Sequence, residues 1–245
     1  MSSKLLRDML VPLRALSKSI DMVVPDTCYV CGELLVGDES VICAHCLLDL
    51  PRTMLHYMQD DAVLSSLATS VPVGRSAAWF RYEKGSDFAR LILLMKFGNR
   101  PRLGTLLAEK FARELMPTVF FGGIDVIIPI PMYWYKRFRR GYNQTEYVAK
   151  GISNITGLPI DTGLRAVRYH SAQARKNAEQ RKSNLVGTMA YRGAVDELKG
   201  RHVLLVDDIV TTGATMQEAV RALAIDSGVG RVSILSLGRA HSFDI

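Results

Sequence analysis

The sequence predicts an α/β protein in which a parallel sheet is flanked by helices and preceded by a small N-terminal four-cysteine module. Two short runs, residues 124–130 and 203–206, are almost entirely apolar, which is typical of strands that are buried on both faces. Helical stretches alternate with such runs along the chain, and this alternation favours a parallel sheet covered on both sides. All four cysteines lie within residues 28–46.

The N-terminal segment predicts an amphipathic helix over residues 3–20, because its apolar residues recur at helical spacing. Arg7, Asp8 and Arg14 interrupt the apolar run, so it does not resemble a secretory signal. No stretch of the chain reaches the roughly 18–20 apolar residues of a membrane span. We therefore expect no membrane span and a cytoplasmic location. The helix either packs on the protein's own core, which is the commoner case, or lies on a membrane surface.

The cysteines follow the pattern C-x2-C, eleven residues, C-x2-C, with Cys28, Cys31, Cys43 and Cys46 as its members. Two such turns supply the four thiolates of a tetrahedral zinc site. Disulfides are the alternative, and they are unusual in a chain without an export signal. A site closed by four thiolates has no open position for a substrate, so the expected zinc is structural. His45 would be a fifth ligand and is expected outside the metal's coordination shell.

Composition places few limits on the partners. The net charge is +7 and the isoelectric point is about 9.3, which favours anionic partners such as phosphorylated metabolites, nucleic acid or an acidic membrane surface. We expect the cysteine module over residues 25–48, a helix near 58–68 and a turn at 71–74. We place a boundary there, so that residues 1–70 form the N-terminal helix and zinc-ribbon-like module and residues 71–245 form the second domain. That domain is expected to hold strands at 77–82, 124–130, 203–206 and 232–237 and helices at 85–97, 101–116, 143–155 and 214–226.

The strand at 203–206 leads into two acids and a threonine-rich loop before a predicted helix. Ligands of parallel sheets bind beyond the carboxyl ends of the strands, and a helix N-terminus offers free N–H groups and a positive dipole end. Thr211, Thr212 and Thr215 add hydroxyl donors, and Gly213 lets the backbone approach a ligand closely. The segment predicts a phosphate site. It is not a Walker loop, because the lysine of that pattern is absent.

Asp207 and Asp208 are adjacent acids that repel one another at the end of a buried strand. They become useful where they accept hydrogen bonds from the vicinal hydroxyls of a ribose or face a divalent cation. The alternative is an acidic turn that caps the following helix. The complete string, V-L-L-V-D-D-I-V-T-T-G-A-T, favours the ribose site over the cap.

This string resembles the thirteen-residue signature of type I phosphoribosyltransferases over residues 203–215. The resemblance implies a phosphoribosyltransferase-like fold for residues 71–245 and a site for phosphoribosyl pyrophosphate with Mg²⁺. It implies that Asp207 and Asp208 hold the ribose hydroxyls. It also implies that the 5-phosphate is wrapped by the loop residues Thr211, Thr212, Gly213, Ala214 and Thr215.

A basic loop is predicted at residues 136–144, where four cations precede a glycine and an asparagine. Arginine side chains offer paired donors to phosphate oxygens, so the loop predicts a pyrophosphate site with Arg137, Arg139, Arg140, Gly141 and Asn143. A second basic segment, residues 165–182, carries six cations against one acid and lacks apolar periodicity. It predicts a mobile loop that closes over the leaving group.

The phrase R-F-R-R-G-Y-N-Q at residues 137–144 resembles the R-x-x-x-R-G-[FY]-N-Q region of the ComF family, also called GntX-like. Gln173, Arg181 and Asn184 fall where that family shows its Q…R…N pattern, and the cysteine module and the turn at 96–98 also fit. The resemblance covers residues 25–240. It implies a role in competence, meaning DNA uptake and use, with protein partners in the competence machinery.

Two functions stay open. The first is an enzyme that transfers phosphoribosyl to an acceptor that the sequence does not identify. The second is a non-catalytic competence protein that keeps the site as a sensor and binds single-stranded DNA. The basic segments and the aromatic run Tyr133-Trp134-Tyr135 support the second function, although the aromatic side chains could equally be packing. None of the histidines has a spacing that marks a general base, so no catalytic residue is predicted.

Overall fold

The structure is a computed structural model of the chain, and it describes residues 27–58, 61–68, 70–168 and 186–240. Contacts divide the chain into two compact units, Met1–Asp49 and Leu50–Ile245. Residues 50–70, which we assigned to the N-terminal module, are grouped by their contacts with the second unit. The domain boundary near residue 70 stays a prediction. The expected helix at 3–20 lies outside the described residues.

The first unit is built from tight turns. Antiparallel bridges join Thr27 to Leu34 and Ser40 to Ile42, and the short helix α3 (Ala44–Leu48) follows. The turn after the second cysteine requires Gly32, whose φ of 83° lies in the left-handed region.

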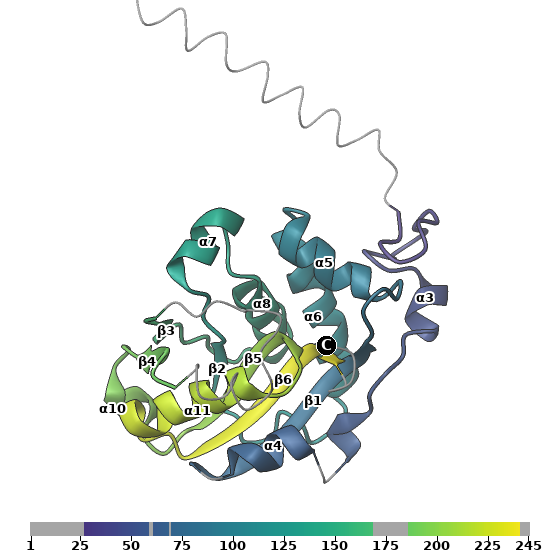
Figure 1. The fold of residues 1–245 in the computed structure, drawn as a ribbon. Helices are drawn as coiled ribbons and strands as arrows, with labels where there is room; N and C mark the ends of the chain where they lie inside the picture. The colour runs from purple at the N-terminus through teal and green to yellow at the C-terminus, as the bar shows by residue number, and fades with distance from the viewer. Residues whose placement is uncertain (1–26, 59–60, 69, 169–185, 241–245) are drawn as a thin grey trace, which may run out of the picture. The chain divides into compact units, whose positions relative to one another are not determined.

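The second unit is organised around a four-stranded sheet in the order β1-β6-β5-β2, and all three strand pairs are parallel (Figure 1). Its strands are β1 (Val73–Tyr82), β2 (Val126–Pro129), β5 (His202–Val210) and β6 (Arg231–Ala240). In the register, Leu204 faces Ile127 on one side and Ser233 on the other. Because the strands are parallel, their carboxyl ends meet at one edge, and this edge holds the site.

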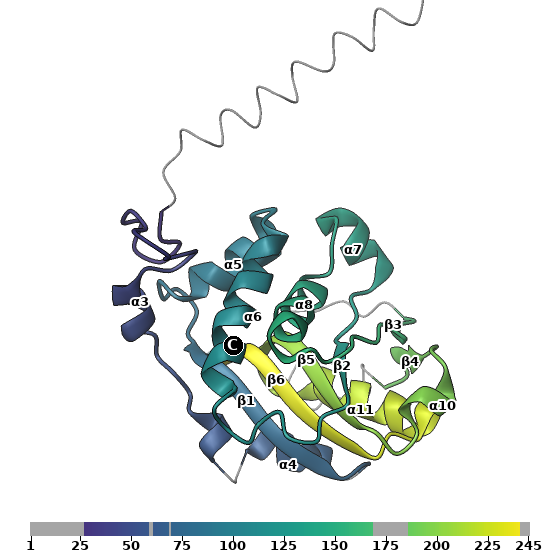
Figure 2. The ribbon, with the colours of Figure 1, turned by 180° about the vertical axis from the view of Figure 1, so that it is seen from behind.

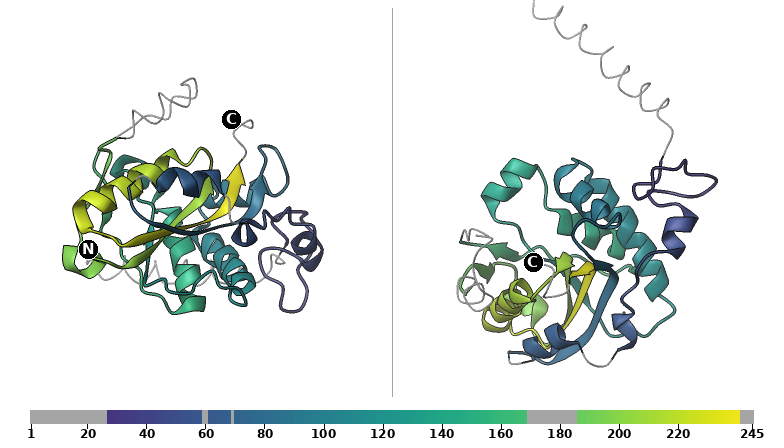
Figure 3. Two further views of the ribbon diagram at one scale, coloured as in Figure 1. Left: turned by 90° about the horizontal axis from the view of Figure 1, so that it is seen from below. Right: turned by 45° about the vertical axis from the view of Figure 1, so that its right-hand side comes forward.

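Helices cover both faces of the sheet, as the apolar strands predict. One face carries α5 (Ala89–Phe97), α6 (Pro101–Leu115) and α8 (Gln144–Thr156), and the other carries α4 (Ala62–Leu67) and α11 (Ala214–Ser227) (Figure 2; Figure 3, left). On the second face Val203 and Leu205 lie in one apolar cluster with residues of α4 and α11. Leu204 and Val206, which alternate with them, are fully buried as well.

Helices α6 and α8 approach one another closely at Gly151. A Cβ atom at this position would lie 2.3 Å from the carbonyl oxygen of Thr105, so only glycine fits there. The N-terminus of α8 is also fixed, because the Asn143 side chain accepts a hydrogen bond from the Thr145 N–H, and the Asn143 amide and the Thr145 hydroxyl both donate to the Ile130 carbonyl. The start of α8 is thereby tied to the end of β2.

The structure corrects several expectations about local structure. Residues 134–140, expected as a loop, form helix α7 (Trp134–Arg140), which ends at Gly141 with a φ of 86°. The sequence did not predict this helix, because its cations and aromatic residues form no buried apolar stripe. The basic segment begins in a strand, β3 (Leu164–Ala166), which pairs with β4 (Met189–Tyr191). β1 already begins at Val73, inside the turn expected at 71–74.

The helix expected near 58–68 is shorter. Met58 follows the 3-10 turn η1 (Leu55–Tyr57), and α4 begins only after Asp61, whose side chain caps the Val63 N–H. A further short helix, α10 (Val195–Leu198), was not predicted. Among the described helices, none combines the length and apolar character needed to cross a bilayer.

Candidate functional site

The four cysteine sulfurs form a cluster in the first unit. Their Sγ atoms all lie within 4.8 Å of one another, and the Sγ atoms of Cys31 and Cys43 are 3.8 Å apart. Zinc–sulfur bonds of about 2.3 Å place two tetrahedral ligands roughly 3.8 Å apart, whereas a disulfide needs about 2.05 Å. All four cysteines are free thiols. The cluster therefore fits a structural zinc ion, as predicted.

Backbone N–H groups donate hydrogen bonds to the cysteine sulfurs, which favours the thiolate form that binds a metal cation. The Sγ of Cys28 accepts hydrogen bonds from the N–H groups of Val30 and Cys43, and the Sγ of Cys43 accepts one from Cys46. Burial raises the pKa of Cys28, but hydrogen bonds from the backbone of Cys31, Cys43 and Val30 outweigh it and bring the pKa down to about 7. Burial raises the pKa of Cys46. His45 instead contacts Asp49, with 3.2 Å between Nδ1 and Oδ2, and takes no part in the cluster.

The two acids lie at the carboxyl end of β5, as predicted. Asp208 is 3% exposed, and its Oδ1 accepts a hydrogen bond from the Ile209 N–H. Its Oδ2 is buried without a hydrogen-bond partner, although the Nζ of Lys96 lies 3.2 Å away as an ion-pair partner. The carboxylate is therefore buried and incompletely satisfied.

Asp207 is perturbed more strongly. Burial, followed by the charge of Asp208, raises the pKa of Asp207 well above its usual range, and Lys96 acts in the opposite direction. Each carboxylate accepts one backbone N–H, and the Oδ2 of Asp208 has no hydrogen-bond partner. Two adjacent carboxylates of this kind form a site that attracts hydroxyl groups or a divalent cation. Carboxylate oxygens are the ligands that Mg²⁺ prefers. The chemistry of the pair therefore fits Mg²⁺ and the hydroxyls of a ribose.

A pocket of about 410 Å³ opens beside these acids, and we call it the acid-pair pocket. Three of its cations come from two helices: Lys96 from α5, and Lys136 and Arg140 from α7. The Arg140 guanidinium also lies over the Phe97 ring, 5.3 Å from its centre. Burial, and then the charge of Arg140, lowers the pKa of Lys136. An anion placed between the cations would relieve their mutual repulsion. The residues of this pocket used below are Lys96, Lys136, Arg140, Asn143, Arg168, Asp207, Asp208 and Thr215.

The phosphate loop, residues 209–215, enters α11 as predicted. Gly213 adopts a left-handed φ of 79° at the start of the helix, and a Cβ there would lie 2.5 Å from the Val63 side chain. Ala214 begins the helix and is buried. Thr215 lines the acid-pair pocket, whereas Thr211 and Thr212 line a separate pocket on the α4 side. The alternative of an acid cap for α11 is not seen, because Gly213 holds the cap position without a side-chain hydrogen bond.

Only some of the residues predicted to bind pyrophosphate lie at the acid-pair pocket. Arg140 and Asn143 line the acid-pair pocket. Arg137 is paired with Glu146 at 2.8 Å and lines a smaller neighbouring pocket. Arg139 is exposed and Gly141 ends α7. Gln173, Arg181 and Asn184 lie outside the described residues, as does His170.

Sequence reasoning named none of Lys96, Lys136 and Arg168 as an individual site residue, although each lines the pocket. Lys96 lies more than a hundred residues before Asp208 in the chain. Its signal was the Lys96-Phe97-Gly98 turn, but only the packing of α5 on α6 and the sheet brings its Nζ to the acid pair. Lys136 and Arg168 belong to basic segments, and the sequence alone does not show which cations of such a segment face the pocket.

Comparison with known proteins shows which family the chain belongs to. Residues 102–234 match the family described as "Phosphoribosyl transferase domain". The DNA utilization protein YhgH of Salmonella typhimurium is 26% identical over 230 residues, which is 89% of this chain and 99% of that protein. Competence protein F of Haemophilus influenzae is 32% identical over 117 residues, or 47% of this chain and 51% of that protein. A solved structure, that of the allosteric regulatory enzyme of purine biosynthesis, matches 56% of this chain and 25% of its own, at 20% identity and a TM-score of 0.37.

Proposed function

From the fact that this chain belongs to the phosphoribosyl transferase domain family, we propose that it binds phosphoribosyl pyrophosphate in the acid-pair pocket and transfers the phosphoribosyl group to an acceptor. The observation that carries this proposal is the meeting of three features around one space: an adjacent pair of acids with one unsatisfied oxygen, a helix N-terminus and cations from α5 and α7. A ribose that carries phosphate at both ends requires this set of groups.

Each part of the ligand has a matching partner. The ribose 2- and 3-hydroxyls donate to Asp207 and Asp208, and the Oδ2 of Asp208 has no hydrogen-bond partner of its own. The 5-phosphate accepts hydrogen bonds from the N–H groups of the phosphate loop at the positive end of α11. Lys96, Lys136 and Arg140 face the pyrophosphate. Mg²⁺, when it is bound with the ligand, adds positive charge between the acids and the phosphates.

The reaction is a displacement at C1 of the ribose. The C1–O bond breaks, its electron pair leaves with pyrophosphate, and a lone pair of the acceptor forms the new bond to C1. Negative charge grows on the leaving group, and the cations of the pocket are placed to stabilise it. None of the described residues that line the pocket is a histidine, and we assign no general base. The acceptor is left to experiment.

We expect the full chain to bind phosphoribosyl pyrophosphate with Mg²⁺ about tenfold or more tightly than ribose 5-phosphate, because the pyrophosphate adds charge-assisted contacts worth about 1.5–3 kcal/mol each. Isothermal titration calorimetry measures both affinities. A screen for pyrophosphate release across amines, nucleobases and single-stranded DNA then tests turnover. If neither ligand binds, the proposed function is refuted.

A second function is favoured by the surface of α7. Trp134 is 65% and Phe138 is 81% exposed, and basic residues, among them Arg137 and Arg139, are interleaved with them. Exposed aromatic rings stack on bases, and adjacent cations bind phosphates. Two relatives are named for DNA utilization and for competence, which supports a role of this chain in DNA uptake and use. This surface would bind single-stranded DNA.

We expect Phe138→Ala to weaken single-stranded DNA binding about tenfold, since one base-stacking contact contributes roughly 1–3 kcal/mol. Arg139→Ala should lower the salt dependence by about one counterion. Fluorescence anisotropy with labelled oligonucleotides over a range of salt concentrations measures both. Val119→Ala is the matched control, because Val119 is also exposed, at 74%, and lies away from α7 in the sequence. Salt-independent or absent binding would rule out the DNA function.

A further inference from the structure

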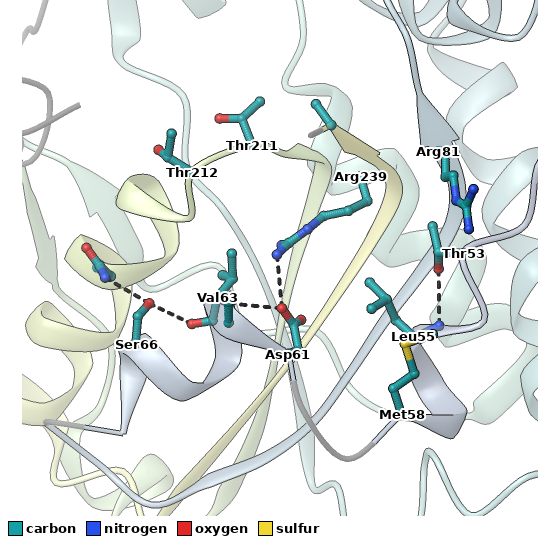
Figure 4. Close-up of a pocket in the computed structure, with 13 residues that line it drawn as sticks. Thr53, Leu55, Met58, Asp61, Val63, Ser66, Arg81, Thr211, Thr212 and Arg239 are labelled. Carbon is teal, nitrogen blue, oxygen red and sulfur yellow. Dashed lines mark hydrogen bonds and ion pairs between the residues drawn. The ribbon is translucent and has the colours of Figure 1, made fainter. Parts of the chain in front are cut away.

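A second pocket, of about 480 Å³, is lined by residues around η1 and α4, by the carboxyl ends of β1 and β6, and by the phosphate loop (Figure 4). It shares no lining residue with the acid-pair pocket. The loop nevertheless contributes to both, because Thr211 and Thr212 line this pocket and Thr215 lines the other. We call it the Asp61 pocket after its buried carboxylate.

The carboxylate of Asp61 is half satisfied. Its Oδ1 accepts hydrogen bonds from the Arg239 guanidinium and from the Val63 N–H, both at 2.9 Å. Its Oδ2 is buried and has no hydrogen-bond partner, and the side chain is only 3% exposed. A buried acceptor without a donor costs about 1–3 kcal/mol. A ligand that donates a hydrogen bond to this oxygen would supply the partner that the described part of the chain lacks.

Among the described residues that line the pocket, the cations exceed the acids. Arg239 and Arg81 line it together with the carboxylate of Asp61, so the formal charges of these three side chains sum to +1. Within the described residues, the Arg239 guanidinium donates one hydrogen bond, to Asp61, and a guanidinium has five N–H donors. Figure 4 shows the Arg239–Asp61 pair beside the open space, with Arg81, Leu55 and Met58 across from it. Leu55 and Met58 add an apolar wall.

These features limit the class of ligand. Inorganic phosphate would match the arginines but would meet the negative charge of Asp61. A simple amine would match Asp61 but would meet two guanidinium groups. A ligand that carries a protonated amine next to a carboxylate matches both Asp61 and the two arginines. Charge-assisted hydrogen bonds of this kind are about twice as strong as neutral ones. We propose that the Asp61 pocket binds a small amino carboxylate, with its ammonium on Asp61, its carboxylate on Arg239 and Arg81, and its apolar part on Leu55 and Met58.

The phosphate loop links this ligand to the first site. An occupant touches Thr211 and Thr212, and Gly213 of the same loop packs directly on Val63 of α4. A ligand that holds the loop in its bound form changes the affinity for the 5-phosphate, and the effect is reciprocal. This linkage rests on the proposed function, whereas the amino carboxylate site itself does not.

The test uses the full chain and calorimetry with the twenty protein amino acids as probes. For the tightest binder, the analogue without the amine and the analogue without the carboxylate are titrated as well. We expect one or more amino acids to bind and each analogue to bind about tenfold more weakly, since each removes a charge-assisted bond. Binding that survives both deletions, binding of simple anions or amines alone, or no binding at all would overturn the proposal.

Two variants locate the ligand without disturbing the core. Arg81→Gln should weaken amino acid binding about tenfold, and Met58→Trp should abolish it by filling the pocket, since Met58 is 56% exposed and can change without loss of buried packing. Arg113→Gln, at an exposed arginine of α6, is the matched control and should bind as the unchanged chain does. Equal affinity in all three variants would place the ligand elsewhere and overturn the assignment.

Phosphoribosyl pyrophosphate is titrated with and without the amino acid, and its affinity should change about fivefold or more. An unchanged affinity would overturn the linkage. If phosphoribosyl pyrophosphate binds but no amino acid does, only this inference fails. If an amino acid binds but phosphoribosyl pyrophosphate does not, the proposed function fails and the amino carboxylate site stands.

Discussion

Replacing Asp207 and Asp208 together by asparagine is expected to reduce the affinity for phosphoribosyl pyrophosphate by at least about a hundredfold, because two charge-assisted bonds of roughly 1.5–3 kcal/mol each are lost. Asparagine keeps the size of each side chain, so Ile209 and Asp208 backbone N–H groups still find an oxygen acceptor. Calorimetry with Mg²⁺ measures the affinity, and thermal unfolding should show a protein at least as stable as the unchanged chain.

The gain in stability follows from the charges. The pair is destabilised by burial and mutual repulsion, and Lys96 and the Asp208 N–H oppose this, so neutral side chains remove an unfavourable term. Asp196→Asn with Glu197→Gln is the matched control, since it neutralises an adjacent, exposed acidic pair on α10. It should leave the affinity unchanged. Unchanged affinity in the Asp207–Asp208 variant would refute the ribose assignment.

Proton release on binding is a further consequence of the same pair. The raised pKa of Asp207 means that the free protein holds a proton at pH values where an ordinary aspartate has lost it. Cationic Mg²⁺ beside the carboxyl favours the ionised form, so binding should release up to about one proton below that pKa. Calorimetry in buffers of different ionisation enthalpy measures this number. Proton uptake on binding would contradict the assignment of Asp207.

Loss of zinc is expected to unfold the first unit. Purified protein should contain about one zinc ion per chain, and structural zinc contributes about 10–16 kcal/mol to the folding of small zinc modules. Cys43→Ser removes one thiolate, while the serine hydroxyl keeps an acceptor for the Cys46 N–H at the start of α3. We expect the variant to lose its zinc and residues 27–49 to lose protection from hydrogen exchange. Elemental analysis and hydrogen exchange with mass spectrometry measure the two effects.

His45→Ala is the matched control for the zinc experiment. His45 lies two residues from Cys43, but it contacts Asp49 and is exposed, with 84% of its side chain accessible. This variant should keep the full zinc content, because four thiolates already close the site. A zinc-free chain with an ordered first unit would contradict the prediction. Loss of zinc from the His45 variant would contradict the four-thiolate assignment.

The predictions that the structure confirmed came from patterns with a strong local cause. The runs 124–130 and 203–206 predicted buried parallel strands because both faces must be apolar, and the structure places β2 and β5 there. The cysteine spacing predicted a cluster because two tight turns bring thiols together. Where cations and aromatic residues alternate without a buried stripe, the same reasoning failed, and α7 was expected as a loop.

The sequence by itself therefore determined the fold class, the four-cysteine cluster and the place of the acid pair and phosphate loop at the end of one strand. These features depend on residues that are close together in the chain, so their spacing carries the information. Only the tertiary structure brought Lys96 to Asp208 and Asp61 to Arg239, because each contact joins elements more than a hundred residues apart. Which cations face the acid-pair pocket, and that a second pocket lies behind the phosphate loop, follow from helix packing on the sheet rather than from any local pattern.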